Sequence, residues 1–300
     1  MRPIAFLTSR CMVGGGPDRR ADHWEHELEF EPMAAACARL GLELRAVVWD
    51  REDLDPRDFE AMVVGTTWDY AEQVQAFLSR LESFARVVPL FNPVDVLRWN
   101  LDKGYLADLG QRGAPIVPTL WRERADAGTL GAAFDELQCD ELVVKPRVGA
   151  CAWRQARVRR GESLPGAEEL PPGAALLQPF LPAVATEGEY SFVFFGPEFS
   201  HCAQKLPAAG DYRVQSIFGA RERVHLPSPE ELALARAVLA AATDEPLLQA
   251  RVDMVRGPEG GLLLMELELV EPYLYPEQGP RMGEVFARAL RARLDGPPSG

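Results

Sequence analysis

The sequence predicts an α/β protein in which a parallel sheet near the N-terminus is followed by a second part built from hairpins. Strand-like and helix-like segments alternate over residues 4–91, and this alternation is typical of a parallel sheet. Later in the chain, apolar runs meet at turns rich in glycine and proline, which indicates hairpins. A length of 300 residues is sufficient for a sizeable core and favours two domains.

The first part divides into short segments. Strands are expected at residues 4–8, 42–49, 61–68 and 87–91, and helices at residues 29–41 and 71–85. Ligands of a parallel sheet gather beyond the carboxyl ends of its strands. The segment TTWDY, residues 66–70, lies at such an end and is a candidate for substrate binding. The alternative is that Trp68 and Tyr70 only cover the core.

The segment 9–29 is unusually long for a connection between a strand and a helix. Its GGGP run matches neither the GxGxxG fingerprint nor the spacing of a P-loop. His23 and His26, with Glu25 and Glu27, are residue types that bind metals. A solvated surface loop or a short helix is the favoured interpretation, and a lid over the substrate stays open.

Two lysines follow in positions that suit a phosphate. Residues 91–119 indicate a helix that begins at Asn100 or Asp102 and ends at Gly113, with Lys103 in its first turn. The helix dipole disfavours a cation there unless an anion is near, although an ordinary surface lysine is the alternative. Lys145 ends the apolar run ELVV and precedes a glycine-containing turn, so its side chain is able to reach a phosphate.

Two further segments complete the middle of the chain. The run ALLQPFLP, residues 175–182, is expected to be a strand that ends in prolines, which leave backbone groups outside the ladder of hydrogen bonds. Residues 187–215 indicate a hairpin around Gly196 and Pro197, with Lys205 and Arg213 just beyond its second strand.

The run LLLMELELVEPYLY places Glu266, Glu268 and Glu271 in a segment otherwise as apolar as a buried strand. Residues two apart point to the same face, so Glu266 and Glu268 lie side by side. A hairpin with a four-residue loop at 258–261 would place Asp253 opposite Glu266. Carboxylates in such a group suit Mg²⁺, which prefers oxygen ligands and shares them with phosphates. The alternative is an edge strand with a wet polar face.

Composition narrows the class of protein. The formal net charge of −13 argues against nucleic-acid and anionic-membrane partners, because no basic block offsets it. The five cysteines are scattered without a CxxC pair, which fits a reducing compartment, and Cys151 is interpreted as a buried structural thiol. No run reaches about 18 apolar residues, so neither a signal peptide nor a membrane span is expected. We therefore expect a cytoplasmic protein.

Together these motifs resemble a known family. Lys103, Lys145, the segment Gln178–Leu181, Arg213, and Asp253 with Glu266 and Glu268 occur in the order and rough spacing of the ATP-grasp superfamily. The chain resembles its glutathione-synthetase-like branch over roughly residues 92–275. The runs NPVDVLRWNLDKGYL, KPRVGACAWR, GEYSFVFF, GDYRVQ and RVDMV…MELELVEP are more similar still to the O-ureido-serine cyclo-ligase (D-cycloserine synthetase) type. TTWDY is similar to the Trp-Asp-Tyr motif of that group.

The resemblance implies an ATP-grasp fold, in which two sheets clasp ATP beneath an α+β lid. It implies an N-terminal substrate domain at residues 1–92, an ATP-grasp domain at 93–295 with its lid at about 115–180, and a tail at 296–300.

The resemblance also implies roles for single residues. Lys103 and Lys145 would bind the α- and β-phosphates, and Gln178, Pro179, Phe180 and Leu181 would surround the adenine. Glu187 or Glu189 would bind the ribose or a lysine. Arg213, at the transferred phosphoryl group, and Lys205 are the implied catalytic residues. Asp253, Glu266 and Glu268 would hold two Mg²⁺ ions. The implied substrate residues are Trp68, Asp69, Tyr70, Arg251 and Glu271.

The sequence departs from the family pattern at two places. Many members have asparagine at the third metal position, where this chain has Glu268. The group usually has an arginine before its Trp-Asp-Tyr motif, whereas Gly65, Thr66 and Thr67 precede Trp68 here. With the long 9–29 segment, these departures leave the substrate open.

The expected activity is that of an ATP-dependent, ADP-forming ligase. It would activate a carboxylate or carbonyl oxygen as an acyl phosphate for attack by an amine-type nucleophile, giving an amide bond or a ring in a small amino-acid-like substrate. The alternative is a non-catalytic ATP-binding or sensor protein on the same scaffold, although each expected metal carboxylate and phosphate cation is present. A metal-binding protein based on His23 and His26 is a third interpretation. A homodimer is a further expectation, since ligases of this kind are often dimers.

Overall fold

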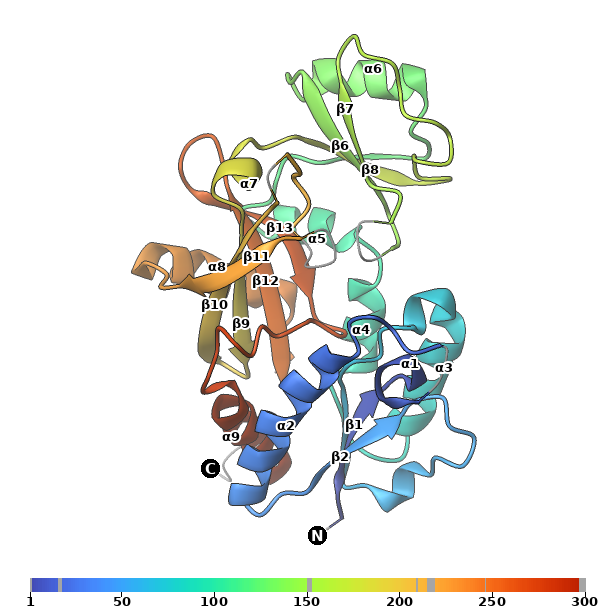
Figure 1. Cartoon of the computed structure of the whole chain (residues 1–300), viewed down its shortest axis with the longest axis vertical. Coiled ribbons are helices and arrows are strands. Elements are labelled where there is room, and N and C mark those ends of the chain that lie inside the picture. The colour runs from blue at the N-terminus through green and yellow to red at the C-terminus, as the bar shows by residue number, and fades with distance from the viewer. Residues whose placement is uncertain are drawn as a thin grey trace.

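Three β-sheets organise the chain. The structure is a computed structural model that describes residues 2–15, 18–149, 153–208, 210–214, 219–245 and 247–296. Within these residues, two four-stranded sheets and one five-stranded sheet are formed. Figure 1 shows the N-terminal sheet, in blue, and a green sheet at opposite ends of the molecule, with the five-stranded sheet between them.

The N-terminal sheet is parallel, as the alternating pattern predicts. Its strands are β1 (Ile4–Thr8), β2 (Leu44–Val48), β3 (Ala61–Val64) and β4 (Leu90–Phe91), in the order β2-β1-β3-β4. The connections contain α1 (Arg10–Val13), α2 (Trp24–Arg39), η1 (Pro56–Asp58), η2 (Tyr70–Glu72) and α3 (Val74–Ala85). The strand expected at 61–68 ends at Val64, because the chain turns and Thr67 N donates to Gly65 O at 3.0 Å.

Helix α2 begins well before the helix expected at residues 29–41. Glu25, His26 and Glu29 are buried although they are polar, so the start of the helix does not follow an apolar pattern. His26 Nδ1 lies 2.6 Å from the hydroxyl of Thr66, which follows β3. Of the interpretations of segment 9–29, the helical one therefore applies from Trp24 onward.

A small layered unit, the lid, contains the second sheet. Its strands are β5 (Leu120–Arg122), β6 (Glu141–Pro146), β7 (Ala156–Arg159) and β8 (Ala175–Pro179), antiparallel in the order β5-β8-β6-β7. Helix α6 (Ala127–Glu136) covers this sheet (Figure 1) and buries Leu130 and Phe134 in a core separate from the others. The lid therefore has an apolar core of its own, while Leu176 of β8 packs into the core of the central sheet.

The central sheet is antiparallel and has the order β11-β10-β9-β12-β13. Its strands are β9 (Glu189–Phe195), β10 (Glu198–Leu206), β11 (Arg221–His225), β12 (Gln249–Arg256) and β13 (Leu262–Glu268), and α7 (Ala183–Thr186) links it to the lid. The hairpin expected around Gly196 is formed by β9 and β10. Lys205 lies inside β10, so its expected place beyond the strand is wrong.

Among the described residues, three helices pack on one face of the central sheet. They are α4 (Val94–Asn100), α5 (Tyr105–Gln111) and α8 (Pro229–Ala242). Leu106 of α5 and Val238 of α8 share a core with Phe192 of β9.

The single helix expected from Asn100 or Asp102 is wrong, since Lys103 lies in the turn between α4 and α5. The carboxylate of Asp102 forms that turn by accepting from Gly104 N at 2.8 Å.

The β12–β13 hairpin brings the carboxylates together as predicted, but by another route. Asp253 pairs with Glu266, and Arg251 pairs with Glu268. The loop between the strands is one residue longer than expected, because Gly257 also belongs to it. A β-bulge between Asp253 and Met254 compensates for that residue and restores the register.

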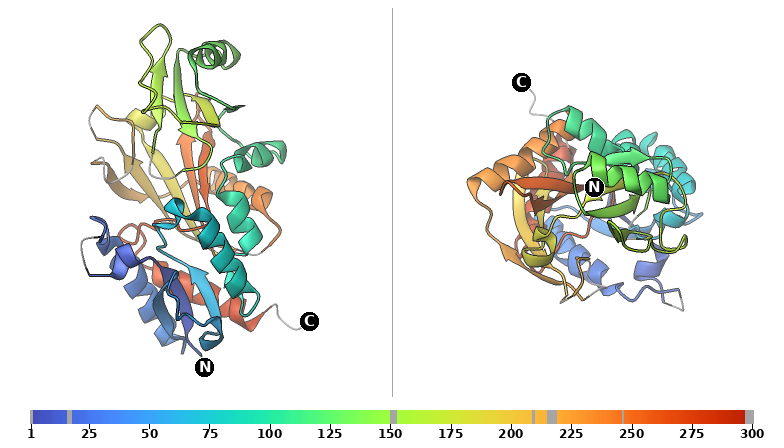
Figure 2. Two further views of the ribbon diagram at one scale, coloured as in Figure 1. Left: turned by 90° about the vertical axis from the view of Figure 1, so that its right-hand side faces the viewer. Right: turned by 90° about the horizontal axis from the view of Figure 1, so that it is seen from above.

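The end of the chain returns to its beginning. Helix α9 (Met282–Asp295) packs beside α2, as Figure 1 and the left view of Figure 2 show. Phe286 and Leu290 of α9 belong to the same buried core as Phe6 of β1 and Met33 of α2. Val193 of the central sheet also lies in this core, so the N-terminal sheet and the central sheet are packed as one body.

Candidate active site

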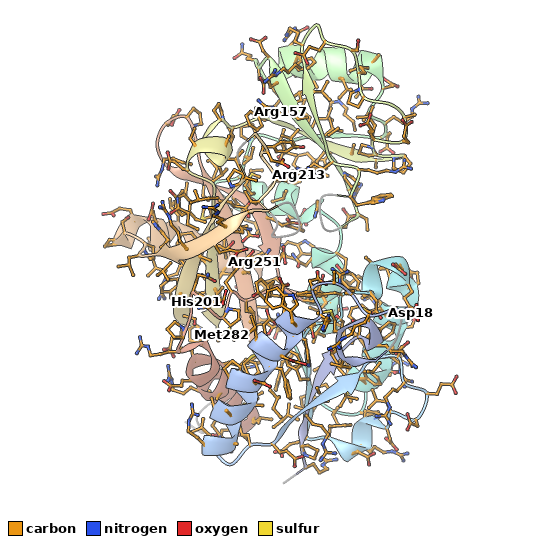
Figure 3. The ribbon with its side chains drawn as sticks, viewed as in Figure 1. Asp18, Arg157, His201, Arg213, Arg251 and Met282 are labelled. Atoms are coloured by element: carbon orange, nitrogen blue, oxygen red, sulfur yellow. The ribbon has the colours of Figure 1, made fainter. Side chains whose placement is uncertain are left out.

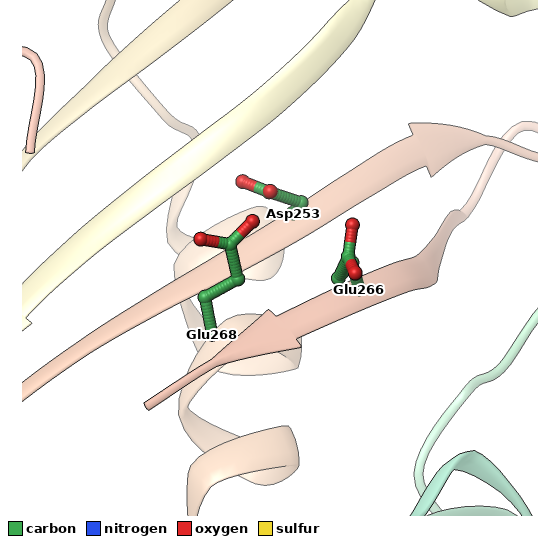
Figure 4. Close-up of side chains that lie close together, drawn as sticks. All are labelled: Asp253, Glu266 and Glu268. Atoms are coloured by element: carbon green, nitrogen blue, oxygen red, sulfur yellow. The ribbon is translucent and has the colours of Figure 1, made fainter. Parts of the chain in front are cut away.

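Three carboxylates converge where β12 and β13 pair. Oxygen atoms of Asp253, Glu266 and Glu268 all lie within 4.8 Å of one another, and Figure 4 shows their side chains on one side of the two strands. Leu267 points the other way into the core and is 1% exposed. Among the described residues, this is the group of His, Cys, Asp and Glu side chains with the spacing of a metal site, and the histidines of α2 do not belong to it.

Basic side chains surround these carboxylates. Arg251 Nη2 lies 2.8 Å from Asp253 Oδ2 and also donates to Glu268. Lys205 Nζ lies 3.5 Å from the same Asp253 oxygen, and Lys103 Nζ donates to Glu266. The protein therefore neutralises its own carboxylates with three buried or half-buried cations.

The proton affinities of the carboxylates differ because their neighbours differ. Burial acts to raise the pKa of Asp253, but Arg251 and Lys205 outweigh it and hold that pKa at about 2. Burial raises the pKa of Glu268 to about 7. The repulsion of Glu266 also raises this pKa, and the attraction of Arg251 only partly opposes the rise. Asp253 is thus the fixed anion of the group, and Glu268 is the member whose charge depends most on what binds.

Beside the carboxylates lies a pocket between the lid and the central sheet. It is lined by lid residues, the Gln178–Leu181 segment and residues of the central sheet: Val143, Lys145, Gln155, Gln178, Pro179, Phe180, Leu181, Val184, Glu189, Tyr212, Arg213, Val214, Val255, Met265 and Glu266. Apolar walls with a few charged groups are typical of a small-molecule site. Gln178 is buried and donates to Thr119 Oγ1 at 2.9 Å, which fixes its side chain.

The two lysines predicted for phosphate both lie near Glu266. Burial lowers the pKa of Lys145, and the attraction of Glu266 offsets only part of that effect. Burial also opposes the charge of Lys103, but the attraction of Glu266 outweighs it and raises the pKa of Lys103. Both lysines therefore share one carboxylate. A bound anion such as a phosphate would stabilise the charged form of Lys145, which burial disfavours.

The glutamates named for ribose or lysine contact lie in different surroundings. Glu189 is buried, lines the pocket and accepts from Lys205. Glu187 instead accepts from Arg256 Nε at 2.7 Å and lies outside the pocket lining. The lysine contact that the resemblance implies is thus present at Glu189.

Arg213 lies in a segment that follows β10. Its side chain pairs with Asp211, with Nη2 to Oδ2 at 2.7 Å, and this contact lowers the pKa of Asp211 to about 2. Figure 3 shows Arg213 between the lid and the central sheet, where it lines the pocket.

The Trp-Asp-Tyr segment spans the junction of the N-terminal sheet with the metal strand. Trp68 Nε1 donates to Glu271 O at 3.1 Å, and the Tyr70 side chain lies near the Glu271 carboxylate. Burial and the charge of Glu268 raise the pKa of Glu271 to about 8. The Asp69 carboxylate turns toward the N-terminal core instead, where Trp49 Nε1 donates to it at 2.8 Å.

Sequence analysis missed two residues of this site. Ser191 is buried and donates to Asp253 Oδ1 at 2.6 Å, and its signal was a lone hydroxyl in the apolar run of β9. The ring centroid of Tyr275 lies 5.7 Å from Lys205 Nζ and 5.4 Å from the guanidinium carbon of Arg251. No local pattern marked Tyr275, because the contact depends on a turn after β13.

Comparison with known proteins also identifies relatives of the D-cycloserine synthetase type. The family model "D-cycloserine synthetase DcsG, N-terminal domain" matches residues 4–92. The cycloserine biosynthesis protein DcsG of Streptomyces lavendulae is 32% identical over 289 residues, covering 89% of this chain and 94% of that protein.

Solved structures agree with this relationship. A crystal structure of D-cycloserine synthetase DcsG has a TM-score of 0.81 and 30% identity, covering 97% of this chain and 99% of that chain. The D-alanine–D-alanine ligase of Bacillus anthracis complexed with ATP has a TM-score of 0.65 at 17% identity, covering 97% of this chain and 95% of that chain. The ATP-grasp ligase PsnB has a TM-score of 0.66 at 14% identity, covering 96% and 97%. Identities this low support the fold alone.

The predictions of an ATP-grasp ligase, of its α/β fold class and of its similarity to D-cycloserine synthetase are confirmed. The described residues include no helix with the length and apolar character that a membrane crossing requires. The chain belongs to the D-cycloserine synthetase family of ATP-grasp ligases, enzymes that use ATP to form amide bonds or cyclised products.

Proposed function

We propose that this enzyme activates the carboxylate or carbonyl oxygen of a small amino-acid-like substrate as an acyl phosphate and then closes an amide bond or a ring through an amine-type nitrogen. The observation that carries the proposal is the convergence of Asp253, Glu266 and Glu268 beside a pocket that contains Lys145. An oxygen-only, carboxylate-rich set fits Mg²⁺, which prefers such ligands and shares them with phosphates. The name of the curated relative, a cycloserine biosynthesis protein, supports ring closure.

ATP occupies the pocket under the lid in this proposal. Lys103 and Lys145 bind its phosphates, and Gln178 with the Pro179–Leu181 backbone surrounds the adenine. Phe180 N already donates to Glu141 O at 2.9 Å, so recognition of the base falls to the neighbouring backbone groups. Glu187 or Glu189 is the candidate for the ribose. Both are paired with a cation, Glu187 with Arg256 and Glu189 with Lys205, and Glu189 is the one that lines the pocket.

Asp253, Glu266 and Glu268 would hold two Mg²⁺ ions, with Glu266 shared between them. Bound Mg²⁺ would neutralise the phosphates and stabilise the charge of the transferred phosphoryl group. Arg213 would contact that phosphoryl group from the pocket wall, and Lys205 would keep Asp253 and Glu189 in place. These side chains position groups and neutralise charge, which are the main contributions a protein makes to phosphoryl transfer.

The reaction has two steps. An oxygen of the substrate attacks the γ-phosphorus, the bond to the β-phosphate oxygen breaks, and ADP leaves. The nitrogen then attacks the acyl carbon, the carbon–oxygen bond to phosphate breaks, and the nitrogen loses its proton. Trp68, Tyr70 and Glu271 would form the substrate side of the site, and Asp69 would hold their segment in place through its contact with Trp49. Arg251 would stabilise the oxyanion that develops at the acyl carbon.

The wider assignments belong to the same proposal. Residues 1–92 would form the substrate domain and residues 93–295 the ATP-grasp domain, with its lid at about 115–180. The tail proposed at 296–300 lies outside the described residues beyond 296, as does Cys151 of the lid loop. A cytoplasmic enzyme is proposed because ATP is its co-substrate and the described cysteines are free thiols. A homodimer remains part of the proposal.

Release of ADP tests this function. The purified protein would be incubated with Mg·ATP and a panel of amino acids, short peptides and O-ureido-serine, with a coupled assay for ADP. We expect ADP to appear only with a substrate that carries both an activatable oxygen and a nucleophilic nitrogen, in equal amount with phosphate. Binding of Mg·ATP without ADP release from any compound in the panel would favour a non-catalytic nucleotide-binding protein.

A further inference from the structure

An arginine and two aromatic rings form a stack at the joint between the lid and the pocket. The guanidinium carbon of Arg157, on β7 of the lid, lies 3.6 Å from the centroid of the Phe180 ring. The ring of Tyr212 meets Phe180 edge-on, with centroids 5.9 Å apart and planes at 89°. The stack therefore joins the lid, the segment that leads out of it and the segment that carries Arg213.

One residue of the lid fixes the first half of this stack. Glu141 accepts from Arg157 Nε at 2.7 Å, and its backbone oxygen accepts from Phe180 N at 2.9 Å. The guanidinium and the ring are thus both held relative to the start of β6. Arg159 also donates to Glu141, at 2.7 Å, but no contact joins it to Phe180 or Tyr212 among the described residues.

The second half of the stack leads directly to Arg213. The carboxylate oxygen Oδ1 of Asp211 accepts from Tyr212 N at 2.7 Å and from Arg213 N at 2.9 Å. The same carboxylate holds the Arg213 side chain. The guanidinium carbon of Arg157, on β7, also lies 6.0 Å from the centroid of the Tyr212 ring. Asp211, Tyr212 and Arg213 therefore form a braced turn whose middle residue is attached to the lid.

We propose that Arg157 and Tyr212 are positioning residues that set Arg213 against the transferred phosphoryl group when the lid covers ATP. The inference rests on the function proposed above, in which Arg213 contacts that group. Displacement of a catalytic group by about 1 Å is able to lower a rate by about a hundredfold, so a brace on Arg213 acts on turnover. Figure 3 shows Arg157 on the lid and Arg213 next to it below, so the stack ties the position of Arg213 to that of the lid.

Four single variants test the brace. Tyr212→Ala and Arg157→Ala should each lower kcat by about ten- to a hundredfold with a much smaller change in the KM for ATP. Tyr212→Phe keeps the ring and should retain most of the wild-type kcat. Arg159→Ala is the matched control. It removes an arginine of the same strand that also donates to Glu141 but does not contact the stack.

A double variant separates positioning from a general structural role. If Tyr212 acts through Arg213, Tyr212→Ala combined with Arg213→Ala should be no slower than Arg213→Ala alone. Calorimetric affinity for a non-hydrolysable ATP analogue with Mg²⁺ should stay within about threefold of wild type in Tyr212→Ala, since the brace acts on the transition state.

The outcomes distinguish the two proposals. A slow Arg213→Ala with normal kcat in Tyr212→Ala and Arg157→Ala would overturn the brace and leave the proposed function intact. Additive losses in the double variant, or an equal loss in Arg159→Ala, would also overturn it. Wild-type kcat in Arg213→Ala would instead contradict the role of Arg213 in the proposed function.

Discussion

Lys145 and Lys103 approach the same glutamate, yet burial affects their charges differently. The pKa of Lys145 is lowered by burial despite Glu266, so its charge is poorly compensated in the protein alone. Lys103 donates directly to Glu266 and its pKa is raised. Of the two side chains, Lys145 gains more from a phosphate.

Lys145→Ala should therefore raise the KM for ATP and lower kcat, because a buried cation aimed at the phosphates is lost. The ligand-free fold should keep its thermal midpoint or gain slightly, since a desolvated charge has been removed. Steady-state kinetics and a thermal melt check both parts. Arg147→Ala, which alters an exposed arginine that lies two residues after Lys145 and pairs with Asp102, serves as the control. Unchanged ATP kinetics would remove Lys145 from the site.

Glu266→Gln keeps the shape of the side chain and removes one charge. Turnover should fall by about a hundredfold or more, because metal ions at a phosphoryl group contribute several kcal/mol and glutamine is a weaker ligand. Repulsion from Asp253 and Glu268 alone would predict a more stable ligand-free protein. Lys103 and Lys145 reverse that expectation, since their attraction lowers the pKa of Glu266 and the charged form is the one that folding favours.

The thermal midpoint of ligand-free Glu266→Gln should thus fall slightly, while ADP release falls steeply. Both quantities are measurable on one preparation, by thermal melting and by the coupled assay. Wild-type turnover in this variant would return the carboxylates to the interpretation of a wet polar edge.

The positions of single residues could be predicted from the sequence where spacing along the chain alone determines the geometry. Alternation in a strand placed Glu266 and Glu268 on one face, and the hairpin placed Asp253 opposite Glu266. The cations that neutralise them could not be located in the same way. The contact of Lys103 with Glu266 joins positions 163 residues apart, and only the folded chain defines it.

Among the elements, α2 is the one whose sequence was hardest to interpret. Its first turns bury Glu25, His26 and Glu29, and Glu29 Oε1 accepts from Leu274 N at 2.5 Å. The buried partner lies in the segment after β13, so the apolar periodicity that marks most helices is absent there. The strands of the N-terminal sheet were predictable because their burial depends on short apolar runs.

Glu29 gives α2 a pH-dependent contribution to stability. Burial raises its pKa from 4.5 to about 8. The unfolded chain releases this proton near pH 4.5 and the folded protein near pH 8, so between them the folded state binds more protons. Stability from this residue is therefore present below about pH 4.5 and is lost as pH rises toward 8.

Glu29→Gln cannot titrate and still offers an oxygen to Leu274 N. Its free energy of unfolding relative to wild type should rise between pH 5 and pH 8, by on the order of 1 kcal/mol per pH unit at most. Urea unfolding at several pH values measures this difference. Glu27→Gln, an exposed change on the same helix, is the matched control. A pH-independent difference for Glu29→Gln would mean that Glu29 is ionised in the folded protein.

Across the whole molecule, the charges of the site are balanced before anything binds. Arg251, Lys205 and Lys103 pair with Asp253, Glu189, Glu266 and Glu268, and Lys145 stands near Glu266. Adding Mg²⁺ alone would make this group positive. Adding ATP together with Mg²⁺ supplies phosphates for the lysines as the carboxylates turn to the metal.

Mg²⁺ and ATP should consequently each strengthen the binding of the other. Calorimetric titration of Mg²⁺ should give weak or undetectable binding without nucleotide and clear binding with a non-hydrolysable ATP analogue. The reverse titration should show the same coupling factor, as linkage requires. In Asp253→Asn the coupling should fall, because one carboxylate of the metal set is gone. Equal Mg²⁺ affinity with and without nucleotide would contradict a shared site.

The packing of α9 on α2 has a consequence for how the protein is made. The core that the N-terminal sheet shares with α9 needs Phe286 and Leu290, which are synthesised long after Phe6 and Met33, before Phe6 and Met33 are fully covered. Until α9 has been made, the nascent N-terminal sheet exposes an apolar face that a chaperone would recognise. The lid has its own core and is able to fold earlier, on the ribosome. A chain cut short before Met282 would therefore carry a folded lid and an open N-terminal sheet, and would be prone to aggregate.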